Sequence, residues 1–493
     1  MKKHIIYCII CLGVIFTSCD ALENIKFLQE KPIKESVQGF IQTKKDADLV
    51  VMSCYKELKM YHNYSRYYHT VSECLSDYGE GAGSYAPGSL MQGLDPTLDE
   101  RTANVWAHMY RCIKTCNSIL LSMELADGMS GEEKDQVEAE VRFLRAYVYQ
   151  ILTQCWGPVP FITEDNMGED GYARTDVETI WAACVQDLLF AVDHLPEEQE
   201  LIGRATKYAA ATALCYQYLL QKNYSAAAAA AKIVMDSQRF SLVEVSTSED
   251  FKKLFGPDIL NTSEEIFYYK YIVADADHNY LSNCFAVMLH APGAEGAAYF
   301  GETRYGGIIT YASNQCIADW PEADLRKAFN LYTADRDGVE TLYNKKFWTT
   351  EVNGERCAND APIYRYADVL LYYAEAEAFA NGSPDADALE ALNMVHRRAY
   401  GYLSTAPSPV DYSLSSFADN EAFLKTILSE RCYEFCYEAK RWNDLKRVGK
   451  LAEYIKYARG VDVGPGGYYW PIPNDEIINN KLMDPAKDQN PGY

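Results

Sequence analysis

Four pairs of helix-forming segments place the strongest limit on how this chain can fold. The clearest pair covers residues 206–220 and 225–236, which the four residues QKNY join. Alanine occupies nearly every position at which these two helices would pack closely, as in tetratricopeptide-type helix pairs. The other three pairs lie near 136–195, 367–398 and 421–457. The sequence therefore predicts a mainly α fold, built on a tetratricopeptide-like helical-repeat scaffold.

Two irregular regions interrupt this helical pattern. Residues 239–364 are rich in Gly, Tyr and Asn and have no clear period, and residues 61–93 are dense in Tyr, Gly, Ser and Pro. Such composition favours loops that present aromatic side chains. Because loops on a repeat scaffold often carry function, we expect ligand binding in these two regions. Residues 46–493 are expected to form a single domain.

The amino terminus has the pattern of an export signal. A basic start and an apolar run over residues 5–16 are followed by small residues directly before Cys19, as in a bacterial lipobox. This predicts a signal peptide over residues 1–18, lipid attachment at Cys19, and a lipidated N-terminus and tether over residues 19–45. No later segment approaches the roughly 18 uninterrupted apolar residues of a membrane span, so the lipid would be the only membrane anchor.

The charge balance excludes one class of partner. The chain carries 70 acidic and 46 basic residues, for a formal net charge of −24. A nucleic-acid-binding protein needs a concentrated basic surface, so we expect no nucleic-acid partner. The 39 tyrosines, against 18 Phe and 7 Trp, suit flat apolar surfaces that also form hydrogen bonds.

No sequence motif indicates catalysis. The chain has no GxSxG, HExxH, P-loop or strand-associated GxGxxG pattern. We therefore expect a binding protein and not an enzyme.

The sequence also contains no complete metal-binding motif. The segment DRDG at 335–338 resembles part of a calcium loop, but the acid expected at the twelfth position is missing, so we interpret it as a surface turn. The pairs Cys112/Cys116 and Cys432/Cys436 lack further ligands and are expected to be buried apolar residues. We predict no metal site and no cofactor, and leave a structural calcium ion open.

A row of charged residues marks the last helix pair. In a continuous helix over 429–447, the charged residues Glu430, Glu434, Arg441 and Asp444 would fall within an arc of roughly 80°. One interpretation makes Glu430 an acid catalyst. We favour a structural ion network that ties this pair to an earlier one, because buried charges mostly occur in paired networks. The candidate partners in earlier segments are Arg142, Arg145 and Arg365.

Several segments resemble the SusD/RagB family of Bacteroidetes. They are EVRFLRAYVYQILTQCWGPVPFI, RYADVLLYYAEAEAFANG with ALNMVHRRA, SERCYEFCYEAKRWNDL, and the ending YYWPIPNDEIINN with QNPGY. The resemblance implies four helix pairs that carry an irregular ligand-binding region. It also implies a lipoprotein on the outer face of the outer membrane, which acts as a lid over a SusC-like TonB-dependent transporter and captures nutrients, usually glycans.

A glycan site needs exposed aromatic faces with polar groups beside them. We hypothesise that such a site is formed by the aromatic residues Tyr64, Tyr67, Tyr78, Tyr85, Tyr299, Tyr305 and Trp320, with the polar residues Asp77, Arg304 and Asn314. Packing in the core is the alternative for each of these aromatic residues. Capture of peptides or glycopeptides, and a purely structural interaction repeat, remain alternative functions.

Overall fold

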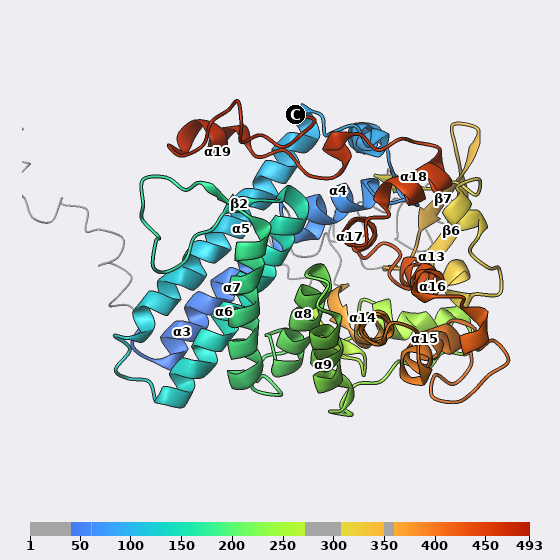
Figure 1. The fold of residues 1–493 in the computed structure, drawn as a ribbon, viewed down its shortest axis with the longest axis horizontal. Coiled ribbons are helices and arrows are strands. Elements are labelled where there is room, and N and C mark those ends of the chain that lie inside the picture. The colour runs from blue at the N-terminus through green and yellow to red at the C-terminus, as the bar shows by residue number, and fades with distance from the viewer. Residues whose placement is uncertain (1–40, 61, 272–306, 350–358) are drawn as a thin grey trace, which may run out of the picture.

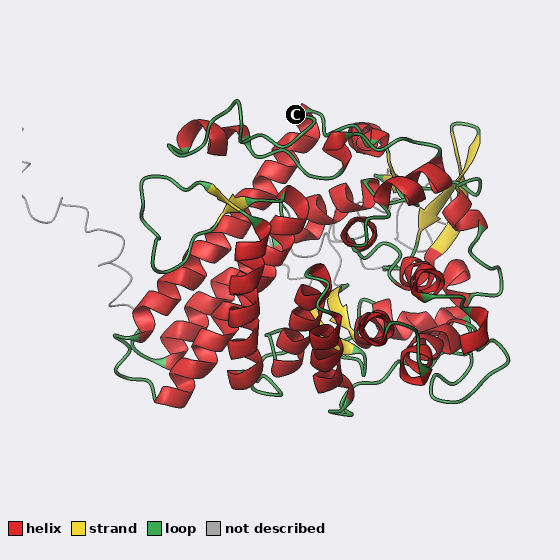
Figure 2. Cartoon of the chain, viewed as in Figure 1, coloured by secondary structure: helices red, strands yellow, loops and turns green. Residues whose placement is uncertain are grey.

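The computed structural model describes residues 41–60, 62–271, 307–349 and 359–493, and it is mainly helical (Figures 1 and 2). The sheets within these ranges each contain two strands. This confirms the predicted fold class. None of the described helices combines the length and the apolarity that crossing a membrane would require. The predicted signal peptide, Cys19 and the tether up to residue 40 lie outside the described residues.

Four long helices form the amino-terminal part of the scaffold and lie side by side in Figure 1. They are α3 (Lys44–Lys59), α5 (Pro96–Met123), α6 (Gly131–Trp156) and α7 (Val177–His194). Each begins after a polar residue whose side chain accepts a backbone N–H of the first turn, a cap worth about 1 kcal/mol. These N-caps are Thr43, Asp95, Ser130 and Asp176.

The second and third predicted pairs are present close to their expected bounds. They are α8 (Lys207–Leu220) with α9 (Tyr224–Met235), and α14 (Tyr366–Asn381) with α15 (Ala386–Ala399). Helix α9 packs against both α8 and α14. Its residues Ala227, Ala230 and Ala231 are buried, and their small side chains let the helices approach closely.

The fourth predicted pair is three helices: α16 (Asn420–Glu434), α17 (Arg441–Arg447) and α18 (Leu451–Arg459). No continuous helix runs through residues 429–447, so the condition for a single row of charges is not met. Tyr437 and Ala439 adopt left-handed backbone angles, with φ of 61° and 58°, and these angles end a right-handed helix. The charged residues of the segment therefore do not form a single row.

Glu430, Glu434 and Arg441 instead form ion pairs with distant segments, and Asp444 pairs with Arg431 on α16. Glu430 and Glu434 both accept hydrogen bonds from Arg326, at 2.8 and 3.1 Å. Arg441 donates to both carboxylate oxygens of Asp77, at 2.9 and 2.7 Å. Asp444 accepts from Arg431. Of the proposed earlier partners, Arg365 contacts Glu434, whereas Arg142 and Arg145 pair with Asp187.

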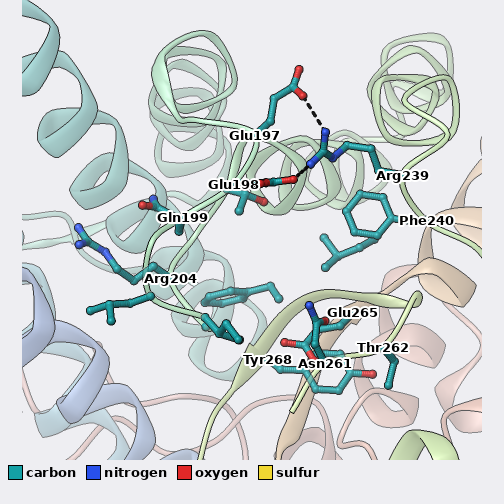
Figure 3. Close-up of a pocket in the computed structure, with 16 residues that line it drawn as sticks. Glu197, Glu198, Gln199, Arg204, Arg239, Phe240, Asn261, Thr262, Glu265 and Tyr268 are labelled. Carbon is teal, nitrogen blue, oxygen red and sulfur yellow. Dashed lines mark hydrogen bonds and ion pairs between the residues drawn. The ribbon is translucent and has the colours of Figure 1, made fainter. Parts of the chain in front are cut away.

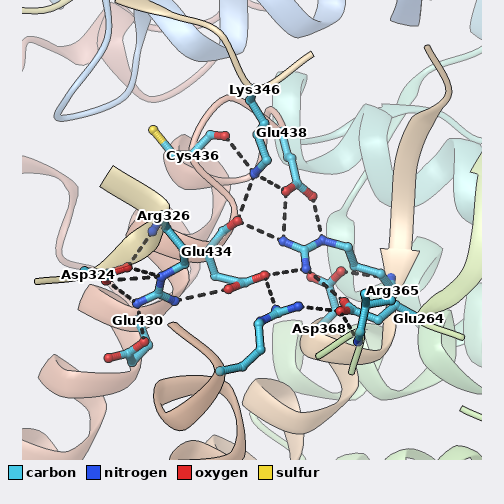
Figure 4. A network of polar contacts seen from close by, with 12 residues as sticks. Glu264, Asp324, Arg326, Lys346, Arg365, Asp368, Glu430, Glu434, Cys436 and Glu438 are labelled. Atoms are coloured by element: carbon cyan, nitrogen blue, oxygen red, sulfur yellow. Dashed lines mark hydrogen bonds and ion pairs between the residues drawn. The ribbon is translucent and has the colours of Figure 1, made fainter. Parts of the chain in front are cut away.

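The contacts of Glu430, Glu434 and Arg365 belong to a buried ion network that joins the irregular insertion to the helical scaffold (Figure 4). Glu434 accepts from Arg398 at 2.6 Å, and Glu438 accepts from Lys346 at 2.5 Å and Arg365 at 2.9 Å. All five of these side chains are almost fully buried. Such charges must stay paired, since an unpaired buried charge costs several kcal/mol.

The described parts of the two irregular regions contain more regular structure than their composition predicts. Residues 61–93 contain a π-helical turn (Tyr64–Tyr68), α4 (His69–Cys74) and a 3₁₀ segment (Gly83–Leu90). In the insertion, the hairpin of β6 (Leu331–Arg336) and β7 (Val339–Asn344) turns at exposed residues with positive φ, namely Asp337 at 56° and Gly338 at 83°. This confirms that DRDG is a surface turn.

Short elements complete the fold. Three strand pairs are antiparallel: β1 (Glu80–Gly81) with β5 (Ile308–Ile309), β2 (Val159–Pro160) with β3 (Arg174–Thr175), and β4 (Glu265–Tyr269) with β8 (Ala361–Arg365). The short helices are α10 (Lys252–Phe255), α12 (Gln315–Ala318), α13 (Leu325–Asn330) and α19 (Asn474–Asn479). Short 3₁₀ segments lie at Ser248–Phe251, Leu414–Ser416 and Pro465–Gly467.

Candidate ligand-binding site

Three of the predicted ligand-binding tyrosines lie in the core. Tyr64, Tyr78 and Tyr85 are 4%, 0% and 3% exposed. The hydroxyl of Tyr78 donates to Glu73 at 2.6 Å and accepts the backbone N–H of Tyr437 at 2.8 Å. Burial raises the pKa of Tyr78 well above its ordinary value. These three rings pack against other protein groups and do not offer a face to a sugar.

The predicted residues around Trp320 are also buried. Trp320 stacks on Tyr433 with ring centroids 4.7 Å apart, in agreement with the alternative that it packs in the core. Asn314 caps α12 and donates to the backbone carbonyl of Asp77 at 2.9 Å. The carboxylate of Asp77 is held by Arg441. The three other predicted residues, Tyr299, Arg304 and Tyr305, lie outside the described ranges.

Tyr67 is the predicted aromatic residue that remains half-exposed, and it lies in a small group of aromatic and basic side chains. Its ring stacks on the exposed His62 with centroids 5.2 Å apart. The guanidinium of Arg101 lies 3.8 Å from the ring centroid of Tyr85 and 5.9 Å from that of Tyr67. Arg101 also donates to the hydroxyl of Ser84 at 2.8 Å. We call these five residues the Tyr67 cluster.

Three separate segments bring this cluster together. Tyr67 lies on the π-helical turn, Tyr85 on the 3₁₀ segment, and Arg101 near the start of α5. Gly81 allows the 3₁₀ segment to pack closely, because a Cβ atom at this position would lie 2.1 Å from the carbonyl oxygen of Tyr85. The N-cap Asp95 fixes where α5 begins and thereby positions Arg101.

The chemistry of the Tyr67 cluster suits a polar ligand with an apolar face. A half-exposed tyrosine ring packs against C–H groups, while the guanidinium and the hydroxyls bind polar oxygens. Partial burial lowers the pKa of His62, and nearby His108 lowers it further. The imidazole is therefore neutral at pH 7, so one nitrogen can donate and the other can accept a hydrogen bond.

A concave site separate from the Tyr67 cluster lies between the α7–α8 connection and β4 (Figure 3). Its volume is about 450 Å³. Arg239 pairs with Glu197 and Glu198 on one side of the cavity, and Glu265 and Tyr268 lie on the opposite side. Burial raises the pKa of Glu265 to about 7. The mixed lining can hold a small polar molecule but offers few exposed aromatic faces.

Three members of the Tyr67 cluster, namely Arg101, His62 and Ser84, are not among the residues predicted from the sequence. Arg101 lies in an acidic helical stretch with no aromatic neighbour along the chain, and only the tertiary fold places it beside Tyr85. His62 could have been found, because it lies in the same aromatic-rich segment as Tyr64 and Tyr67.

Comparison with known proteins relates this chain to SusD-like proteins. Residues 320–493 match a family model described as "SusD family", and residues 26–219 match one described as "Starch-binding associating with outer membrane". "SusD-like protein P25" of Formosa agariphila is 27% identical over 97% of each chain. These descriptions belong to binding proteins, which confirms the expectation that the chain is not an enzyme.

Solved structures show the same fold. A SusD homologue from Bacteroides thetaiotaomicron superposes with a TM-score of 0.78 at 18% identity and covers 94% of this chain and 99% of its own. "Surface glycan-binding protein A" from the same species, in complex with laminarihexaose, gives a TM-score of 0.73 at 21% identity and covers 92% of this chain and all of its own. These likenesses confirm the helical scaffold with its irregular insertion.

Proposed function

The chain belongs to the SusD/RagB family, and we propose that it captures a glycan at the cell surface and delivers it to a SusC-like TonB-dependent transporter. The family is a starch- and glycan-binding one that associates with the outer membrane. A neighbour of the same fold binds laminarihexaose. Both findings support a glycan as the ligand, and the acidic net charge argues against polyanions.

The observation that carries the proposal is the Tyr67 cluster. Its half-exposed ring lies beside a guanidinium, an imidazole and a hydroxyl, which is the mixture that a sugar ring requires. Tyr67 and Tyr85 both come from the segment that the sequence predicts to bind glycans, which supports the proposal that this surface is the binding site. Tyr67 is then the stacking residue, and Arg101 binds hydroxyl groups while resting on Tyr85.

Calorimetry with a panel of oligosaccharides that includes malto-oligosaccharides and laminarihexaose tests this site. We expect Tyr67→Ala and Arg101→Ala each to weaken binding by about 1–2 kcal/mol, a loss of roughly 5- to 30-fold. Tyr457→Ala is the matched control, since Tyr457 is an exposed tyrosine on α18. Unchanged affinity in both cluster variants would exclude this surface. Binding of a peptide library with no glycan binding would support the alternative of peptide capture.

We also propose that lipid on Cys19 holds the protein at the membrane while the folded domain binds ligand. Replacing Cys19 with alanine should release the protein from the outer membrane and impair glycan uptake. The isolated variant should keep its full affinity for the oligosaccharide. Fractionation of cells and calorimetry measure the two effects separately, and co-purification with a large barrel protein tests the transporter partnership. Loss of binding in the purified variant would contradict this division of roles.

A further inference from the structure

Two cysteines from distant parts of the chain lie almost within bonding distance. Cys316 on α12 and Cys432 on α16 are 116 positions apart, and their Sγ atoms are separated by 3.2 Å. A disulfide requires an S–S distance of about 2.05 Å, so closure asks for a movement of roughly 1 Å. Rotation of the cysteine side chains supplies much of such a movement without rebuilding the backbone.

Three further contacts hold the two segments in this arrangement. Trp320 stacks on Tyr433, which is the residue next to Cys432. Arg326 forms ion pairs with Glu430 and Glu434 on α16. These contacts hold the stretch from α12 to α13 against α16 whether or not the sulfurs are bonded. The two thiols are therefore preorganised for oxidation.

The pair is also reachable from solvent. Both cysteines line a cavity of about 200 Å³ that includes Tyr454 and Tyr457, and Cys316 is half-buried. Asp77, the third potential ligand beside the sulfurs, is held through both carboxylate oxygens by Arg441. A metal ion would have to displace this ion pair, whereas a disulfide needs the two sulfurs alone. The geometry therefore favours a covalent cross-link over a metal site.

We propose that Cys316 and Cys432 form a disulfide that staples the irregular insertion to the helical scaffold once the protein meets a thiol-oxidising environment. The oxidant is a small-molecule or protein disulfide. The Cys316 thiolate attacks it, forms a mixed disulfide and releases one thiol. The Cys432 thiolate then attacks the sulfur of Cys316 and releases the second thiol, so the two protons lost by the cysteines end on the two released thiols.

A second group of cysteines provides an internal comparison. Cys54, Cys112 and Cys116 are fully buried, and the Sγ atoms of Cys54 and Cys116 are 3.8 Å apart. In contrast, Cys316 is half-buried and lines the cavity described above. Because an oxidant has no comparable access to Cys54, Cys112 and Cys116, we expect these three thiols to stay reduced under the same conditions.

Peptide mapping of the folded, purified protein tests the cross-link. The protein is incubated with oxidised glutathione, denatured, alkylated and digested without reductant. We expect a peptide pair that joins Cys316 to Cys432 and separates on reduction, and a thermal midpoint a few degrees higher than that of the reduced protein. Cys54→Ala should keep the pair, and Cys316→Ala should leave Cys432 alkylated.

Quantitative alkylation of both cysteines, or a glutathione adduct that persists on Cys316, would overturn the proposal. The mapping uses wild-type protein, so its result does not depend on whether a variant folds. The occurrence of the cross-link in cells rests on the proposed exterior location, but the experiment in solution does not. Glycan affinity, measured on the reduced protein, reports separately on the proposed function.

Discussion

Glu438→Gln should destabilise the protein strongly. Glu438 is fully buried and accepts hydrogen bonds from Lys346 at 2.5 Å and from Arg365 at 2.9 and 3.2 Å. The amide of glutamine has nearly the same shape, but it lacks the charge and turns one acceptor into a donor. That donor would face the ammonium or the guanidinium, both of which only donate. The substitution therefore leaves two buried cations short of a negative partner.

Two independent arguments give the expected loss in the free energy of unfolding. Burial alone would raise the pKa of Glu438, but Arg365 and Lys346 outweigh it and lower the pKa from 4.5 to about 2. A lowering of this size corresponds to about 3 kcal/mol in favour of the charged form. Removal of one partner from a buried ion pair costs about 3–5 kcal/mol in proteins generally. We therefore expect a loss of about 3–4 kcal/mol in the free energy of unfolding.

Equilibrium unfolding in guanidinium chloride at pH 7 measures this loss. The midpoint should fall while the dependence on denaturant stays unchanged, as for a change in stability alone. Glu197→Gln is the matched control, because Glu197 forms an exposed ion pair with Arg239 and should cost less than about 1 kcal/mol. A loss below about 1 kcal/mol for Glu438→Gln would refute the view that this network must be fully paired.

Two other predictions concern pH and packing. The basic neighbours of Glu430 and Glu438 lower the folded-state pKa values of both carboxyls from 4.5 to about 2, although burial acts in the opposite direction. The stability that these two carboxylates contribute should therefore be complete above pH 4.5 and lost as the pH falls toward 2. Unfolding midpoints in a pH series check this, and a midpoint that rises on acidification would contradict it. Gly81→Ala should displace the segment of Tyr85, cost about 1–3 kcal/mol of stability and weaken oligosaccharide binding. Gly131→Ala, where a Cβ atom meets nothing within 4 Å, should change neither, and equal behaviour of the two variants in calorimetry would refute the packing argument.

The helical scaffold was predictable because its signals are local. Polar N-caps, short connections and alanine-rich packing positions are all present within α8 and α9 and predict a helix pair directly. The end of α16 was not predictable in this way. No glycine or proline lies between Glu434 and Arg441, where α16 ends and α17 begins. The left-handed backbone angles of Tyr437 and Ala439 are stabilised by distant contacts. These include the bonds from their backbone N–H groups to Tyr78 and Glu73.

The candidate site was only partly predictable for a related reason. Tyrosine-rich loops look exposed in the sequence, but a tyrosine can be buried when its hydroxyl finds a partner, as Tyr78 does with Glu73. Composition does not show which hydroxyls will have such partners. The sequence therefore indicated the segment that contains Tyr67, while the tertiary fold was needed to place Arg101 beside it.

The buried ion network should also affect the rate at which the protein unfolds. Its pairs join residues far apart in sequence, such as Glu264 with Arg398, 134 positions away, and Asp77 with Arg441, 364 positions away. Burying a charged side chain is favourable only when all of its ion-pair partners are in place. We therefore expect these ion pairs to form after the rate-limiting step of folding. Interactions that are absent from that transition state act mainly by slowing unfolding. At the proposed location on the cell exterior, the network would thus lengthen the lifetime of a protein that meets proteases whenever it opens.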